Sequence, residues 1–340
     1  MLDNKCFIIA ELSANHGGSL DIAKETVRAA KRAGADAIKL QTYTADTITM
    51  DVKTNDFKIQ QDTAWDGQYL YNLYKEASLP WEWHKPLYEL AKEEGLICFS
   101  SPFDKTAVDF LEKLNTPIYK VASFEITDIP LIEYIASKQK PIIISTGIAT
   151  IQDIELAIQA CKSVGNHNIT ILKCTSAYPA APEDANLLTI PDIVKQFGVK
   201  SGLSDHTIGT EAPMIAVALG AKVIEKHFIL DKSIESADAH FSLDENEFKQ
   251  MVEAVRLTEE LLGHVDYEMT DKKKKSREFS RSLYVTRTVK SGDMVTEDNI
   301  RSIRPGFGLH PKYYNKILGK KFVCSVKRGE PLTSQMIEGL

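Results

Sequence analysis

Two short segments each place a histidine at the end of a β-like run. Residues 202–209 read GLSDHTIG and contain His206, and residues 223–229 read VIEKHFI and contain His227. Imidazole nitrogens are common ligands of divalent cations, and a pair of them leaves positions of the ion open for water and substrate. A lone strand histidine is more often structural. The pair therefore indicates an open catalytic metal site if the fold brings the two runs side by side.

Lysines and hydroxyl residues lie at the ends of other β-like runs. Lys39 and Lys120 supply positive charge and nearby hydroxyls supply directional hydrogen bonds, a combination suited to holding a phosphate. The hydroxyls are those of Ser145, Thr146 and Ser204, and Ser123, on the same run as Lys120, is a further candidate for substrate binding. Lys120 could instead be the amine of a Schiff-base aldolase. Glu11 and Glu125 could complete a metal shell, bind a sugar hydroxyl or move protons.

The elements that carry these residues alternate between β and α. Eight β-like runs are separated by helix-period segments, and they span 7–12, 37–42, 96–101, 118–123, 141–146, 169–175, 199–204 and 223–228. The alternation predicts an α/β fold, a (β/α)8 TIM barrel over residues 1–265. An open doubly wound sheet is the main alternative, but no glycine-rich phosphate loop follows the first run. Because barrel active sites lie at the carboxyl ends of the strands, the polar ends of all eight runs indicate an enzyme.

Two further parts interrupt or follow the barrel pattern. Residues 43–95 are rich in aromatics and predict an extra helix or lid between the second and third runs. Residues 266–281 read as a polar linker, and residues 282–340 as a small β-rich domain whose turns are marked by SGD, PGFG and KRGEP. Residues 276–340 carry twelve Lys and Arg against six Asp and Glu, a net charge of +6, and the rest of the chain therefore carries −12. This asymmetry favours docking of the basic domain onto an acidic body over nucleic-acid binding.

Composition excludes several classes of protein. No apolar run approaches the roughly 18 residues that span a bilayer, and MLDNKCFIIAEL lacks the features of a signal peptide. The five cysteines are scattered and read as reduced thiols. We therefore expect a cytoplasmic protein that binds neither nucleic acid nor a membrane.

Eight motifs in order resemble the sialic acid synthase family. They are IIAELSANHGGSLDIAKE, IKLQT, FSSPFD, YKVASFE, IISTG, CTSAYPAAPED, GLSDHT and EKHF. The terminal RSIRPGFGLHP lies in a domain similar to the antifreeze-like (SAF) domain of that family. The resemblance implies condensation of phosphoenolpyruvate with an N-acetylated amino sugar, giving a nine-carbon 2-keto acid and phosphate.

The resemblance also points to a branch of the family. YKEASLPWEWH, KLQTYTADTITM and SIRPGFGLHPKY are most similar to the pseudaminic acid synthase branch, whose sugar is 2,4-diacetamido-2,4,6-trideoxy-L-altropyranose. The N-acetylneuraminate and legionaminate synthases are the alternatives within the family.

The resemblance further implies roles for individual residues. His206 and His227 match the ligands of a divalent metal, normally Mn²⁺. The implied contacts to phosphoenolpyruvate are Lys39, Lys120, Ser145 and Ser204, and those near the sugar are Gln41, Glu125, Tyr178 and Asp238. Glu11 matches a catalytic or supporting acid. Arg304 matches an arginine placed over the barrel mouth of the partner subunit, which implies a domain-swapped homodimer.

Overall fold

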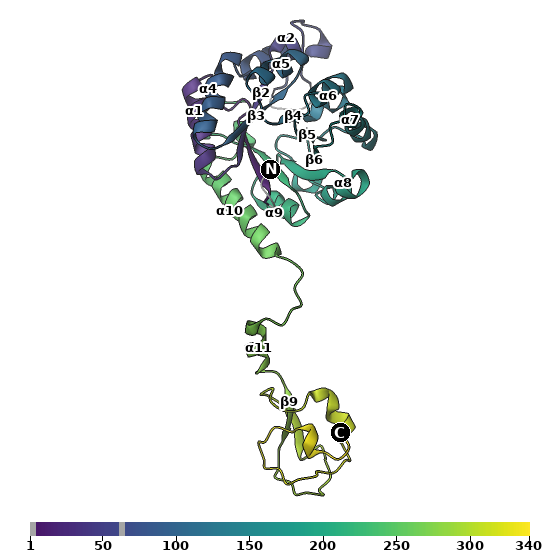
Figure 1. Cartoon of the computed structure of the whole chain (residues 1–340). Helices are drawn as coiled ribbons and strands as arrows, with labels where there is room; N and C mark the ends of the chain where they lie inside the picture. The colour runs from purple at the N-terminus through teal and green to yellow at the C-terminus, as the bar shows by residue number, and fades with distance from the viewer. Residues whose placement is uncertain (1–4, 61–64) are drawn as a thin grey trace. The chain divides into compact units, whose positions relative to one another are not determined.

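The chain forms two compact units. The computed structural model describes residues 5–60 and 65–340, and it divides the chain into Met1–Gly263 and His264–Leu340 (Figure 1). We describe each unit separately.

The first unit is a closed barrel of eight parallel strands that pair in chain order, with the last strand paired to the first (Figure 1). The strands are β1 (Phe7–Glu11), β2 (Ala37–Thr42), β3 (Ile97–Pro102), β4 (Tyr119–Val121), β5 (Ile142–Ser145), β6 (Ile169–Cys174), β7 (Lys200–Asp205) and β8 (Val223–His227). Each lies on a predicted run, with ends that differ by no more than two residues. The predicted TIM barrel is confirmed.

Helices follow the strands around the outside of the barrel (Figure 1). They are α1 (Leu20–Arg32), α4 (Trp81–Glu93), α5 (Lys105–Lys113), α6 (Ile129–Ala136), α7 (Ile151–Ser163), α8 (Thr189–Phe197), α9 (Glu211–Ala218) and α10 (Glu245–Leu262). Between β2 and β3 the chain adds α2 (Ala45–Ile48) and α3 (Leu70–Ala77). The boundaries follow local chemistry. For example, α7 begins after Thr150, whose hydroxyl accepts a hydrogen bond from the Asp153 amide in a capping box.

Successive side chains of each strand point alternately toward the outer helices and into the barrel lumen, so the barrel has two separate apolar layers. One set of strand residues, including Ile8, Ala10 and Ile38, packs with the apolar faces of α1 and α10. The other set fills the lumen with a separate apolar cluster made by Phe7, Ile9, Ala37, Phe99, Ile118, Ile143, Leu172 and Val223. Gly202 completes this layer, because a Cβ there would lie 2.3 Å from the Val223 carbonyl oxygen and 2.7 Å from Leu172 Cδ2. The amino-terminal part of the lumen is therefore closed by apolar packing.

Two residues beyond that apolar layer, every strand presents a polar side chain or a thiol to the lumen. These residues are Glu11, Lys39, Ser101, Lys120, Ser145, Cys174, Ser204 and Glu225. All eight are buried. The period of two along a strand, applied eight times, thus builds one polar layer at the carboxyl end of the barrel.

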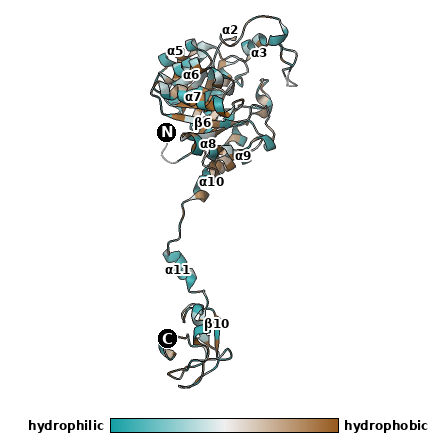
Figure 2. Ribbon diagram, turned by 90° about the vertical axis from the view of Figure 1, so that its right-hand side faces the viewer, coloured by the Kyte–Doolittle hydropathy of each residue, from teal (hydrophilic) through white to brown (hydrophobic). Residues whose placement is uncertain are grey.

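The second unit is a small domain with its own core. β9 (Ser282–Val285) pairs antiparallel with β10 (Ile300–Ile303), a single bridge joins Tyr284 of β9 to Pro331, and further single bridges join segments outside these strands. Leu283, Val285, Ile300, Phe322 and Leu332 are buried together. The domain also contains α12 (Tyr314–Ile317), while α11 (Asp271–Arg277) lies within the residues expected as a linker. Figure 2 shows that α11 is hydrophilic, in keeping with its four lysines.

Candidate active site

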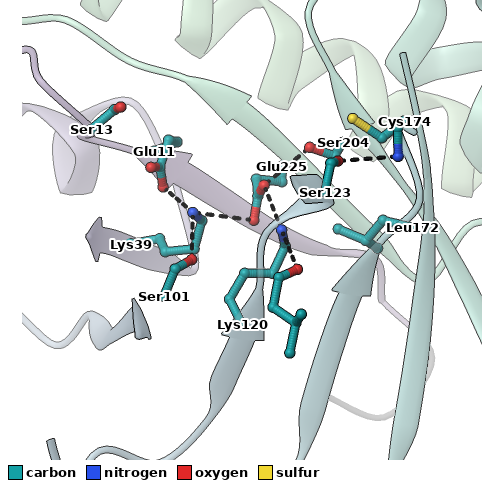
Figure 3. Close-up of polar contacts among 12 residues, drawn as sticks. Glu11, Ser13, Lys39, Ser101, Lys120, Ser123, Leu172, Cys174, Ser204 and Glu225 are labelled. Carbon is teal, nitrogen blue, oxygen red and sulfur yellow. Dashed lines mark hydrogen bonds and ion pairs between the residues drawn. The ribbon is translucent and has the colours of Figure 1, made fainter. Parts of the chain in front are cut away.

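Two lysines and two glutamates form a buried charged cluster in the polar layer of the lumen (Figure 3). Lys39 Nζ lies 2.7 Å from Glu11 Oε2 and 3.9 Å from Glu225 Oε2. Lys120 Nζ lies 3.5 Å from Glu225 Oε1. Since removal of four charges from water is costly, each lysine needs an anion beside it. Glu225 supplies one to both lysines.

Burial and neighbouring charge act in opposite directions on this cluster. Burial and the charge of Glu225 raise the pKa of Glu11 to about 7, although Lys39 opposes the shift. Burial alone would raise the pKa of Glu225, but Lys120 and Lys39 lower it below its usual value. Burial lowers the pKa of Lys120, with Glu225 opposing. Glu225 is therefore the more firmly ionised of the two carboxylates.

The predicted hydroxyl groups surround the lysines. Ser204 Oγ donates to Glu225 Oε1 at 3.0 Å, and Ser123 Oγ accepts from the Gly147 amide at 3.1 Å. Ser145 Oγ is buried without a hydrogen-bond partner among the described residues, so its O–H is available to a ligand. Thr146 differs from the expectation in one respect, because its O–H donates to the Leu172 carbonyl at 2.9 Å.

The two histidines lie at the ends of adjacent strands, β7 and β8. This is the arrangement that a shared metal ion needs. The ring centroids of His206 and His227 are 5.3 Å apart. His206 Nδ1 lies 2.9 Å from the Thr175 carbonyl oxygen, so this nitrogen carries a proton and Nε2 is the ligand atom of the neutral ring. Burial alone would lower the pKa of His206, but Cys174 and the Thr175 carbonyl raise it above its usual value, so metal binding at Nε2 would displace a proton. Burial and surrounding positive charge hold the pKa of His227 well below its usual value. His227 is thus a neutral imidazole, the form that binds a metal.

The donor set around these imidazoles is sparse. His227 Nδ1 has no hydrogen-bond partner among the described residues and lies 3.6 Å from Asp238 Oδ2. Within residues 5–60 and 65–340, no group of three or more His, Cys, Asp or Glu side chains is arranged to hold a metal. The residues present therefore fit a cation held by two imidazoles, with its other positions open to water or substrate.

A cavity of about 520 Å³ lies beside the charged cluster. Five predicted site residues line it together with His227: Gln41, Ser123, Glu125, Tyr178 and Asp238. The inserted segment between β2 and β3 supplies an apolar wall that includes Ile48, Leu70, Leu73 and Tyr74. Gln41 connects the two regions, because its Nε2 donates to Glu11 Oε1 at 3.1 Å and to Ser13 Oγ at 2.9 Å. A ligand in the cavity would face polar groups on the barrel side and, on the insert side, these apolar groups together with Asp56 and Lys58.

Glu125 is one of the carboxylates that line the cavity, together with Asp56 and Asp238. Burial raises its pKa to about 7, while Lys120 opposes the shift. Its Oε2 is buried without a hydrogen-bond partner among the described residues. A carboxyl group with a pKa near neutrality can take up and release protons at the operating pH. Tyr178 lies next to the histidines, with its ring centroid 4.4 Å from that of His206.

Arg304 belongs to the second unit. It follows β10 in the second unit and is exposed. Its expected place over a barrel mouth stays a prediction.

Sequence reasoning missed three residues of the polar layer: Ser101, Cys174 and Glu225. Ser101 Oγ accepts a hydrogen bond from Lys39 Nζ at 3.3 Å. No role was predicted for Glu225, although its position two residues before His227 puts both on one face of β8. Cys174 Sγ lies 3.9 Å from His206 Nδ1. Burial alone would raise the pKa of this thiol, but the contact with His206 lowers it to about 7. Cys174 could have been predicted to face the lumen, because it lies two residues after the lumen residue Leu172 on β6.

Comparison with known proteins identifies the class. Residues 26–267 match the NeuB family, and residues 280–338 match the SAF domain. The chain belongs to the NeuB family, as the ordered motifs predicted.

Individual relatives span nearly the whole chain. It is 51% identical to a pseudaminic acid synthase of Campylobacter jejuni over 97% of this chain and 96% of that protein. A pseudaminic acid synthase of Helicobacter pylori is also 51% identical, over 97% of both chains. The crystal structure of an N-acetylneuraminic acid synthetase from Leptospira borgpetersenii is 30% identical, with a TM-score of 0.72 over 81% of this chain and 91% of that one. In the described part of the chain, no helix has the length and apolar character needed to cross a membrane.

Proposed function

We propose that this protein is a pseudaminic acid synthase. It condenses phosphoenolpyruvate with 2,4-diacetamido-2,4,6-trideoxy-L-altropyranose and water, giving a nine-carbon 2-keto sugar acid and phosphate. The observation that carries this proposal is the buried cluster of Lys39 and Lys120 at the same end of the barrel as His206 and His227, beside a cavity of about 520 Å³ that His227 lines. Identity of 51% to two pseudaminic acid synthases, against 30% to the N-acetylneuraminic acid synthetase, favours this branch of the family.

The buried lysines bind the phosphate of phosphoenolpyruvate. Lys39 and Lys120 supply charge, and the hydroxyls of Ser145 and Ser204 supply directional donors. Thr146 lies at the same end of the barrel but already donates its O–H to the Leu172 carbonyl, so it serves chiefly to shape the site. Ser123 Oγ accepts from the Gly147 amide and lines the cavity. Holding both reactants in one place contributes much of the rate of a two-substrate condensation.

The bonds formed and broken follow from the reactants. Carbon 3 of phosphoenolpyruvate attacks the C1 aldehyde of the open-chain sugar, and a new C–C bond forms. Water adds at carbon 2, and the C–O bond to phosphate then breaks, so that carbon 2 becomes a ketone. Glu125 is the group that transfers protons at the aldehyde or the water, because its pKa lies near 7. Glu11 supports the same end of the site through Lys39 and Gln41.

His206 and His227 would hold a divalent cation, for which we propose Mn²⁺. Such an ion, when bound, acts as a Lewis acid toward the sugar aldehyde. Gln41, Tyr178 and Asp238 line the cavity and would orient the sugar. The reaction takes place in the cytoplasm, where phosphoenolpyruvate is produced.

Phosphate release from phosphoenolpyruvate tests this function. With Mn²⁺ present, we expect turnover with the diacetamido-trideoxy-altrose and little with N-acetylmannosamine, and complete loss after EDTA. Turnover with N-acetylmannosamine or with the legionaminate precursor would keep the family and change the substrate. A Schiff-base aldolase predicts instead that borohydride traps substrate on Lys120 and that EDTA leaves activity intact.

The basic second domain is the proposed lid of a homodimer. Residues 276–340, which include this domain, carry a net charge of +6 against −12 for the rest of the chain, and long-range attraction of this kind favours closure over an anionic site. We propose that Arg304 of each subunit reaches the barrel mouth of its partner, where it contacts the sugar.

Arg304→Ala should therefore raise the KM for the sugar about tenfold, the effect expected when one charged hydrogen bond of roughly 1.5 kcal/mol is lost. The KM for phosphoenolpyruvate should change little, because the lysines bind it deep in the barrel. Arg287→Ala, in the same domain, is the matched control. Initial-rate kinetics with each substrate varied will show the split, and an unchanged sugar KM would remove Arg304 from the site.

A further inference from the structure

A second buried ion pair lies directly beside the two histidines. Lys226 Nζ contacts Asp205 Oδ2 and also donates to the Thr207 carbonyl oxygen. The residues Asp205 and Lys226 are only 3% and 1% exposed. Neither residue lines the cavity, and neither has a role in the reaction described above.

The pair ties the end of β7 to the end of β8. Asp205 Oδ1 accepts hydrogen bonds from the Thr207 amide at 3.0 Å and from Thr207 Oγ1 at 2.8 Å. Lys226 then joins both ends of this turn, the carboxylate of Asp205 and the carbonyl of Thr207, to β8. His206 is the residue enclosed by the turn.

Strand register places the Asp205–Lys226 pair next to the two histidines. Asp205 and Lys226 are Cα partners in the β7–β8 ladder, and β7 ends at Asp205. His206 follows Asp205 and His227 follows Lys226, and the centroids of the two histidine rings are 5.3 Å apart. The β7–β8 ladder ends at Asp205, and the backbone hydrogen bonds of the two histidines run to other segments, from the Ala180 amide to His206 and from the Leu243 amide to His227. The side-chain bonds of Lys226 to Asp205 and Thr207 are therefore a direct link between the two strand ends at the level of the imidazoles.

The energetics agree with a geometric role. A buried ion pair adds little net stability compared with apolar residues of similar size, since desolvation offsets the attraction. Fixed geometry is what such a pair supplies and apolar packing does not. Groups that orient metal-binding imidazoles typically affect metal affinity 10- to 100-fold.

We propose that Asp205 and Lys226 are a positioning pair that holds His206 and His227 at the separation needed to bind one divalent cation. This inference rests on the proposed function, in which the two histidines share that cation. Neither residue touches the reactants.

Mn²⁺ binding to the full-length protein tests the pair without reference to turnover. After removal of metal with EDTA and dialysis, free Mn²⁺ is followed by electron paramagnetic resonance during titration. We expect Asp205→Asn and Lys226→Met each to raise the Kd for Mn²⁺ about 10- to 100-fold. The double variant leaves no unpaired buried charge, so its melting temperature should return toward that of the wild type while its Kd stays high.

Asp36→Asn is the matched control. Asp36 Oδ2 pairs with Arg256 Nη2 at 2.7 Å and accepts the Ile8 amide at 2.9 Å, at the amino end of the barrel. This substitution should lower the melting temperature and leave the Kd unchanged.

Two results would overturn the inference. One is a wild-type Kd in both single variants and in the double variant, and the other is an equal rise in Kd for Asp36→Asn. If the wild-type protein itself bound no Mn²⁺, the metal site of the proposed function would be rejected, and the positioning role of Asp205 and Lys226 would be rejected with it.

Discussion

Glu225→Gln is expected to lower kcat/KM for phosphoenolpyruvate by about 100-fold or more, because it removes the anion shared by two buried lysines. Glu225 lies 3.5 Å from Lys120 and 3.9 Å from Lys39. Without its charge the two ammonium groups repel each other, and Lys120 in particular would lose its proton more readily. A site with fewer charged lysines binds phosphate less well.

The same substitution should destabilise the fold by about 3–5 kcal/mol, the usual effect of leaving a buried charge unpaired. Inorganic phosphate should restore stability to the variant more than to the wild type, since it replaces the missing anion. Urea unfolding with and without phosphate measures this. Glu25→Gln, which removes exposed pairs with Arg28 and Arg32, is the control and should change stability by less than about 1 kcal/mol. Equal behaviour of the two variants would contradict a role for Glu225.

Glu125→Gln is expected to lower kcat by about 100- to 10,000-fold, the range for loss of a general acid or base. The wild-type rate should depend on a group that titrates near pH 7, because burial raises the pKa of Glu125 to about 7. That dependence should be lost from the residual rate of the variant. A variant whose kcat and pH profile match the wild type would exclude Glu125 from proton transfer.

Stability gives an independent check on Glu125 with a defined sign. The pKa rises from 4.5 in the unfolded chain to about 7 in the fold, so the folded state binds this proton more tightly. The contribution of Glu125 to the free energy of unfolding is therefore fully present below pH 4.5 and is lost as the pH rises through 7. The neutral Gln variant should gain up to about 3 kcal/mol over the wild type at pH 8 and much less at pH 4.5. Urea unfolding at both values tests this, and a difference independent of pH would contradict the raised pKa.

Much of this site could be predicted because each strand of a barrel carries its functional residues at its own carboxyl end, where short sequence motifs reveal them. The motifs IKLQT, YKVASFE, GLSDHT and EKHF each place their polar residues at the carboxyl end of a run. Counting eight such runs was enough to infer the barrel, and the barrel was enough to bring Lys39, Lys120, His206 and His227 to one end. The inference required only the period of two along a strand and the rule that strand ends gather at one face.

The contacts within the layer could not be predicted in the same way. Glu225 comes between Lys39 and Lys120 because strands far apart in sequence meet across the lumen, at a stagger that no single run encodes. Thr146 was predicted to present its hydroxyl to phosphate, and the fold directs that hydroxyl to the Leu172 carbonyl instead. Cys174 was set aside as an ordinary thiol, and the fold puts it beside His206.

The sequence by itself determined the barrel, the order of its motifs, the family and the set of residues that could do chemistry. Only the tertiary structure decided which carboxylates face which lysines, which imidazole is held neutral, and which residues line the cavity while others lie beneath it. The reason is that residue type and strand period are local properties. Burial, charge pairing and the resulting pKa shifts arise only when distant segments share one dry interior.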